Sequence, residues 1–133
     1  MPTVSRDDLK KKGLHRLVKS FTYAFDGLKY AFKYEQNILV HTLATILVII
    51  AGIFLKISLT EWLVLALIIG LVIATELINT SIEATIDLIT KDVHPLAKIA
   101  KDTAAAAVLV FGLTAIVIGC IIFLPKILVL IGG

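Results

Sequence analysis

Three long apolar runs constrain the fold of this chain more than any other feature of its sequence. One covers residues 38–55, one begins at Trp62 and continues with helical periodicity to residue 88, and one covers residues 104–124. A helix of about 20 apolar residues crosses the roughly 30 Å hydrocarbon layer of a membrane. Hydrophobic residues fill 59% of the 133 positions, more than a chain this short can bury. The sequence therefore predicts an all-α integral membrane protein with three transmembrane helices.

The segment before the first run, residues 14–34, predicts a fourth helix of a different kind. Apolar residues recur at helical spacing, and charged residues such as Arg16, Lys19 and Lys29 occupy the other side. This pattern is typical of an amphipathic helix in the membrane interface. The alternative is a core-facing helix of a soluble domain. Residues 1–13 are polar and are predicted to form a cytoplasmic tail, which leaves residues 14–133 as a single membrane domain.

Positive charge is concentrated near the N-terminus and predicts the orientation of the chain. Eight of the 13 Lys and Arg residues lie within the first 33 positions. The connection after the first run contains only Lys56, whereas the next contains Lys91, Lys98 and Lys101. The positive-inside rule then places the N-terminus and the second connection in the cytoplasm and the C-terminus outside. We interpret the basic segment as binding anionic membrane lipids rather than nucleic acid.

The sequence also predicts how several residues within and beside the apolar runs pack. His41, Thr42 and Thr45 mark one flank of the first run, which we expect to face protein. Cys120 is the only cysteine, so an intramolecular disulfide is excluded, and we expect it to pack as a small apolar side chain. Pro125 is expected to end the third helix. Three spans bury few helix faces, which favours an oligomer.

A polar stripe on the second span is the main functional signal. It consists of Glu76, Asn79, Glu83 and Asp87, spaced i, i+3, i+7 and i+11. At about 100° per residue these side chains fall within roughly an 80° arc of one helix. Glu76 is expected near the inner boundary of the hydrocarbon, where ionisable groups are costly and usually functional.

The residue types in and near this stripe suit phosphoryl transfer to a lipid alcohol. Carboxylates on one face repel each other unless a cation neutralises them, and Mg²⁺, which prefers oxygen ligands, commonly arrives with phosphates. Lys98, Lys101 and Asp102 follow in the second connection, and Glu35 ends the amphipathic segment. Phosphoryl transfer needs mainly positioning and charge neutralisation.

Simpler interpretations of the stripe remain open at this point. Glu83 and Asp87 fit a solvated helix extension, and Glu76 with Asn79 fits a contact between helices of an oligomer. An ion or proton pathway is a further alternative, although the 14 residues before Glu76 offer only Thr75 as a polar group. No glycine-rich phosphate loop of the G-x-x-x-x-G-K-[ST] type occurs.

Two blocks of residues together resemble the prokaryotic diacylglycerol kinase family. They are Glu76-x-x-Asn79-Thr80-x-Ile82-Glu83-x-x-x-Asp87 and His94-Pro95-x-Ala97-Lys98-x-Ala100-Lys101-Asp102-x-Ala104-Ala105-Ala106. The resemblance covers roughly residues 14–124. It implies a homotrimer of three-span subunits with interface helices and shared active sites. It also implies transfer of the γ-phosphate of ATP, carried with Mg²⁺, to a lipid hydroxyl.

The resemblance also implies roles for individual residues. Glu76 would be the general base for the lipid hydroxyl, and Asn79 would position catalytic groups. Glu35 and Glu83 would hold the Mg²⁺ ions carried with ATP. The remaining nucleotide contacts implied are Arg16, Tyr23, His94, Lys101 and Asp102.

The sequence thus predicts a lipid kinase of the bacterial cytoplasmic membrane. The form of the loop from His94 to Lys98 is more similar to the Gram-positive branch of the family, whose members phosphorylate undecaprenol. The nearer alternative is a diacylglycerol kinase that makes phosphatidic acid, and a remote one is a small oligomeric ion transporter or channel. A non-catalytic membrane anchor would leave the constellation from Glu76 to Asp102 unexplained.

Overall fold

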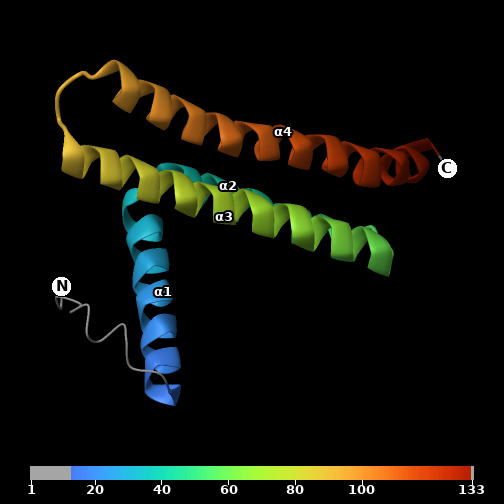
Figure 1. The fold of residues 1–133 in the computed structure, drawn as a ribbon. Coiled ribbons are helices and arrows are strands. Elements are labelled where there is room, and N and C mark those ends of the chain that lie inside the picture. The colour runs from blue at the N-terminus through green and yellow to red at the C-terminus, as the bar shows by residue number, and fades with distance from the viewer. Residues whose placement is uncertain (1–12, 133) are drawn as a thin grey trace. The chain divides into compact units, whose positions relative to one another are not determined.

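The computed structural model describes residues 13–132 of the chain. These residues form four helices in the order α1 (Leu14–Tyr34), α2 (Gln36–Phe54), α3 (Leu59–Ile89) and α4 (Pro95–Gly132), with no strand in this range (Figure 1). By length and composition, α2, α3 and α4 can each cross a membrane. The prediction of an all-α integral membrane protein with three membrane helices is therefore confirmed.

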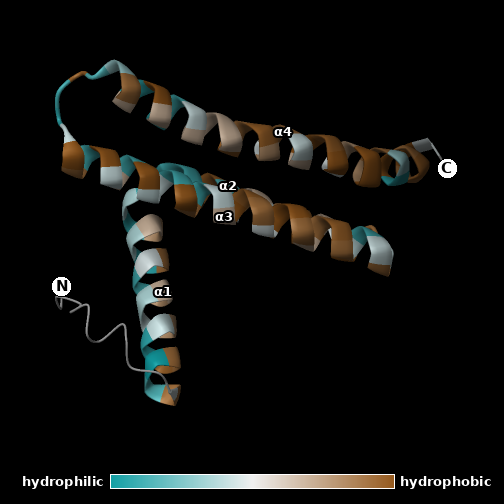
Figure 2. Cartoon of the chain, viewed as in Figure 1, coloured by the Kyte–Doolittle hydropathy of each residue, from teal (hydrophilic) through white to brown (hydrophobic). Residues whose placement is uncertain are grey.

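The helices divide into two compact units, with α1 in the first and α2, α3 and α4 in the second. The first unit contains the predicted amphipathic helix, which carries both polar and apolar residues along its length (Figure 2). α1 begins after Gly13, whose carbonyl accepts hydrogen bonds from the backbone N–H groups of Arg16 and Leu17. Its location in the membrane interface stays a prediction. Residues 1–12 of the predicted cytoplasmic tail lie outside the described residues.

A tight turn joins α2 to α3 and satisfies its own backbone groups. Lys56 adopts a φ of 50°, the left-handed conformation that ends many helices, and the N–H of Ile57 donates to the carbonyl of Gly52. Ser58 then caps α3, because its hydroxyl accepts from the N–H of Glu61 while Glu61 Oε2 accepts from the N–H of Ser58 at 2.6 Å. This reciprocal pair is a capping box, which fixes where α3 begins.

Gly52 lies where the end of α2 packs most tightly against the start of α3. A Cβ atom added there would lie 2.7 Å from Trp62 Cη2 and 3.0 Å from Ile57 Cδ1. We therefore expect Gly52→Ala to destabilise the protein by about 1–3 kcal/mol, the usual cost of overpacking a core. The thermal unfolding midpoint of the purified protein in detergent measures this. Gly70→Ala is the control, since a Cβ at Gly70 meets no atom within 4 Å, and equal losses in both variants would contradict the explanation.

α3 and α4 run side by side in opposite directions and form the packed part of the second unit (Figure 1). The core cluster consists of Ile57, Leu65, Ile68 and Ile122, and it lies toward the end of the bundle opposite the α3–α4 connection. At that end Lys126 Nζ of α4 also lies 3.2 Å from the carboxylate of Glu61 on α3. This ion pair and the core cluster hold the two helices together.

Most large apolar side chains of the membrane helices remain exposed on the described chain. Leu47, Leu67 and Ile121 are examples, each more than 60% exposed. Cys120 is also exposed on the described chain, and its packing as a small apolar side chain against lipid or another subunit stays a prediction. Its exposure arises because α4 buries only the side that faces α3. These surfaces are suited to contact lipid or another subunit.

The predicted start and end of the third helix were wrong. The span expected over residues 104–124 is part of a longer helix that begins at Pro95, since proline fits the first helical position and His94 Nδ1 accepts a hydrogen bond from the N–H of Leu96 (3.2 Å). α4 also continues through Pro125. Lys126 pairs with Glu61, and residues 127–131 are all apolar. In lipid a backbone must satisfy its polar groups internally, which favours continuing the helix through this apolar run.

Candidate active site

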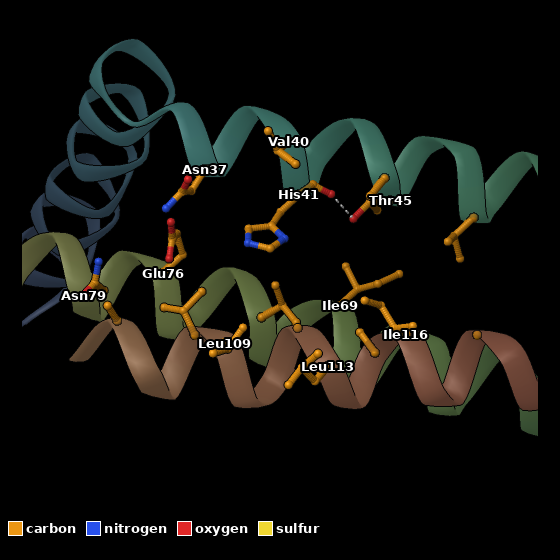
Figure 3. Close-up of a pocket in the computed structure, with 18 of the residues that line it drawn as sticks. Asn37, Val40, His41, Thr45, Ile69, Glu76, Asn79, Leu109, Leu113 and Ile116 are labelled. Carbon is orange, nitrogen blue, oxygen red and sulfur yellow. Dashed lines mark hydrogen bonds between the residues drawn. The ribbon is translucent and has the colours of Figure 1, made fainter. Parts of the chain in front are cut away.

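A cavity of about 690 Å³ lies between α2, α3 and α4 (Figure 3). Most of its lining is apolar, with Val40, Ile69, Leu109 and Leu113 as examples. The polar residues that line it are Asn37, His41 and Thr45 on α2 and Glu76, Asn79 and Glu83 on α3. An apolar cavity with a few convergent polar groups is the usual form of a small-molecule binding site.

The α2 wall of the cavity is the flank that was predicted to face protein. Thr45 Oγ1 donates to the carbonyl of His41 within the helix (2.8 Å), and the His41 ring points into the cavity (Figure 3). Asn37 also lines the cavity, one turn before His41. Neither Asn37 nor His41 was assigned a role from the sequence, and the only available signal was a polar residue within or beside an apolar run.

Glu76 is almost completely buried, with 1% of its surface exposed. Its Oε2 atom lies inside the protein without a hydrogen-bond partner, and its carboxylate points toward Asn37 across the cavity (Figure 3). A buried carboxylate without partners is costly, and more so at membrane depth. Glu76 therefore presents an unused acceptor where a ligand hydroxyl or a cation can meet it.

Asn79 and Glu83 form the next part of the same helix face. Asn79 Nδ2 donates a hydrogen bond to Glu83 Oε1 (3.1 Å). Asn79 is 8% exposed, and its Oδ1 atom has no hydrogen-bond partner. The amide thus orients the Glu83 carboxylate and leaves its own oxygen free. The prediction that Glu76, Asn79 and Glu83 share one face is confirmed by their common place in the cavity lining.

The charged residues near the α3–α4 connection pair with each other instead of lining the cavity. Lys101 Nζ on α4 lies 2.5 Å from Asp87 Oδ1 on α3, and Lys98 pairs with Asp102 one turn along α4. These side chains are 38–70% exposed, so the pairs are weak and can exchange partners with a charged ligand. Asp87, the last member of the predicted stripe, therefore forms an ion pair that connects α3 to α4.

Four further predicted site residues do not line the cavity either. His94 directly precedes α4, where its Nδ1 accepts the hydrogen bond from the N–H of Leu96. Glu35 precedes α2 as its N-cap residue, with no hydrogen bond from its side chain to the helix. Arg16 and Tyr23 belong to α1, in the first unit. Their roles toward metal or nucleotide stay predictions.

The fold and the cavity define an integral membrane protein whose buried acid faces an apolar binding site. Comparison with known families makes this specific. A model of the family described as prokaryotic diacylglycerol kinase matches residues 22–123, and the chain belongs to this family.

Three relatives illustrate the similarity. The chain is 46% identical over 113 residues to an undecaprenol kinase of Bacillus subtilis, which covers 85% of this chain and 92% of the relative. It is 42% identical over 113 residues to a diacylglycerol kinase of Synechocystis, covering 84% of this chain and 65% of the relative. It is 40% identical over 101 residues to a diacylglycerol kinase of Helicobacter pylori, covering 76% and 79% respectively. The prediction of a membrane lipid kinase is therefore confirmed, and the family favours it over an ion pathway.

Proposed function

We propose that the protein transfers the γ-phosphate of ATP to the hydroxyl of undecaprenol at the cytoplasmic face of a bacterial cell membrane. The observation that carries this proposal is the unpartnered Glu76 Oε2 atom, buried at the wall of an apolar cavity. A long lipid alcohol offers a hydrocarbon chain for such a cavity and one hydroxyl proton for such an acceptor. The similarity to the undecaprenol kinase of Bacillus subtilis supports this choice of lipid.

In the proposed reaction, Glu76 acts as the general base. Its Oε2 takes the proton of the lipid hydroxyl while the hydroxyl oxygen forms a bond to the γ-phosphorus of ATP. The bond between that phosphorus and the oxygen bridging to the β-phosphate breaks, and ADP leaves with the electron pair. The proton on Glu76 then passes to solvent. General-base catalysis of this kind contributes about 10²–10⁴-fold to a rate.

The acceptor atoms of the site fit Mg²⁺ delivered with the nucleotide. Within residues 13–132, no group of three or more His, Cys, Asp or Glu side chains is arranged to hold a metal alone. Glu83 and the free Asn79 Oδ1 supply oxygen atoms of the kind Mg²⁺ prefers. Glu83, together with Glu35, would hold the ion, which when bound neutralises phosphate charge. Asn79 keeps the Glu83 carboxylate in place.

The polar end of the bundle supplies the proposed nucleotide contacts. Lys101 exchanges its exposed partner Asp87 for a phosphate, and Asp102 and His94 contact the rest of the nucleotide. Arg16 and Tyr23 of α1 complete this set. The exposed ion pairs offer little resistance to such an exchange, because each is worth only about 0–1 kcal/mol.

The proposed setting of the site follows from charge and exposure. Residues 14–133 form one membrane kinase domain, with α1 in the interface and residues 1–13 as a cytoplasmic tail. The basic residues of the N-terminal segment and those of the start of α4 support a cytoplasmic location for both segments, by the positive-inside rule. The exposed apolar faces of α2, α3 and α4 are suited to subunit contacts, and the resemblance to the family implies a homotrimer with active sites shared between subunits.

Diacylglycerol is the second candidate acceptor, and its phosphorylation would make phosphatidic acid. The similarity to the diacylglycerol kinases of Synechocystis and Helicobacter pylori supports it. It also carries one hydroxyl beside hydrocarbon chains, so the chemistry at Glu76 is unchanged.

The test is a side-by-side measurement of phosphate transfer from radiolabelled ATP, with Mg²⁺, to undecaprenol and to diacylglycerol in mixed micelles. We expect a kcat/KM for undecaprenol at least about tenfold above that for diacylglycerol, the scale on which apolar pockets discriminate. The reverse preference would move the function to phospholipid turnover. No transfer to either lipid, from a folded oligomer, would contradict the proposal.

A further inference from the structure

Two glycines of α4 lie on the wall of the cavity that holds Glu76. Gly112 and Gly119 both line it, and their spacing of seven residues, two helical turns, places them on the same side of α4. Each leaves a gap in a wall otherwise built from Ala105, Leu109 and other apolar side chains.

Close packing within the chain does not explain these glycines. Small residues in membrane helices usually allow two backbones to approach, and Gly52 shows that situation, since its Cβ would meet Trp62 at 2.7 Å. At Gly112 and at Gly119, an added Cβ would meet no atom within 4 Å. Their missing side chains therefore leave open room inside the cavity.

A second observation indicates what this room is for. Glu76, which is 1% exposed and has an unpartnered Oε2, lines the same cavity. A ligand hydroxyl bound at Glu76 places the rest of that ligand along the apolar wall. The surrounding faces of the helices are apolar (Figure 2), which suits a ligand that enters from the lipid phase.

The helix rise gives the depth of each glycine relative to the acid. At about 1.5 Å per residue from the α3–α4 connection, Glu76 lies roughly 20 Å along α3, while Gly112 and Gly119 lie roughly 26 Å and 36 Å along α4. The two helices run side by side in opposite directions. Gly112 is therefore roughly 6 Å, and Gly119 roughly 16 Å, farther from the connection than Glu76.

We propose that Gly112 and Gly119 determine acceptor specificity by keeping the cavity open for the bulky, methyl-branched chain of an isoprenoid alcohol. This inference rests on the proposed function, and it adds the residues that select the chain. The two positions act at different depths. A side chain at Gly112 meets the part of the acceptor near its hydroxyl, whereas one at Gly119 meets only a chain long enough to reach it.

The test uses Gly112→Leu and Gly119→Leu with a ladder of prenols from geraniol through farnesol to undecaprenol. For each alcohol, kcat/KM of the variant is divided by that of the wild type. For Gly119→Leu we expect the ratio to be near one for the shortest acceptor and to fall about tenfold or more for the longest, the size of effect that a misfit in an apolar pocket produces. For Gly112→Leu it should be low for every length. The KM for ATP should stay unchanged in both.

Gly70→Leu is the matched control, because it makes the same change on a membrane helix at a glycine with open space that does not line the cavity. Its ratio should not depend on chain length. The Gly112→Ala and Gly119→Ala variants repeat the comparison with a smaller side chain where leucine impairs folding.

A ratio for Gly119→Leu that does not change with chain length would overturn the inference. A variant that no longer forms the oligomer, and whose ratio is the same for every chain length, would also overturn it. The glycines would then serve contact with a second copy of the chain. A failure of the proposed function is detected separately, because it changes which lipids the wild-type protein phosphorylates. If the wild type phosphorylates only diacylglycerol, a ladder of diacylglycerols with graded acyl chains tests the same glycines, and a length-dependent ratio there would show a chain site that does not require branching.

Discussion

Replacing Glu76 by glutamine is expected to reduce phosphate transfer by about 10²–10⁴-fold, the contribution of a general base. Glutamine keeps the size of the side chain but cannot take a proton from the lipid hydroxyl. The fold should persist, because Glu76 Oε2 makes no hydrogen bond that the substitution would break. The thermal unfolding midpoint should stay the same or rise, since the variant removes an unpartnered buried carboxylate. Single-turnover transfer and thermal unfolding in detergent measure the two effects.

Glu61→Gln is the matched control for this variant. It makes the same chemical change on the same helix, at a carboxylate that caps α3 and pairs with Lys126 at the far end of the bundle. We expect it to retain transfer activity and to lose some stability. An active Glu76→Gln enzyme would rule out Glu76 as the base. A Glu76→Gln protein that unfolds more easily than Glu61→Gln would indicate a structural role for that carboxylate.

Replacing Glu83 by glutamine is expected to weaken the use of Mg²⁺. The carboxylate of Glu83, oriented by Asn79 at 3.1 Å, is the proposed ligand of the ion that arrives with ATP. Its loss should raise the Mg²⁺ concentration for half-maximal activity by at least about 10–100-fold, the cost of losing even an outer-shell partner of a metal ligand. A Mg²⁺ titration at fixed ATP measures this, and removal of the metal by a chelator should stop the wild-type enzyme.

Asp92→Asn provides the control for the metal experiment, because Asp92 is an exposed carboxylate of the α3–α4 connection. Its Mg²⁺ titration should overlay that of the wild type. An unchanged titration for Glu83→Gln, with activity reduced at every Mg²⁺ concentration, would instead indicate that Glu83 positions Asn79 and does not bind the ion.

The contrast between Glu76 and Asp87 shows why only part of the site could be predicted. Both belong to one stripe with helical spacing, and helix geometry alone places them on the same face of α3. Glu76 nevertheless faces the cavity, while Asp87 lies nearer the connection and pairs with Lys101 of α4. The spacing predicts a shared face, but the partner of each side chain depends on which part of α4 lies opposite.

The surroundings of the glycines in the membrane helices also depend on which part of another helix lies opposite. Gly52 is packed against Trp62, whereas Gly70, Gly112 and Gly119 have open space around them. The amino-acid sequence alone does not distinguish the packed glycine from the glycines with open space. The difference arises from which helix lies against each one, and so the open space beside Gly112 and Gly119 could be recognised only in three dimensions.

The sequence by itself determined the membrane class, the number of spanning helices, the amphipathic α1 and the face of α3 that carries Glu76, Asn79 and Glu83. These features depend on composition and on the period of a single helix, which are local properties. The tertiary structure decided the burial of Glu76, the contributions of Asn37 and His41, the extension of α4 and the depth of the cavity. These depend on how α2, α3 and α4 pack against one another, and packing joins residues that are distant in the sequence.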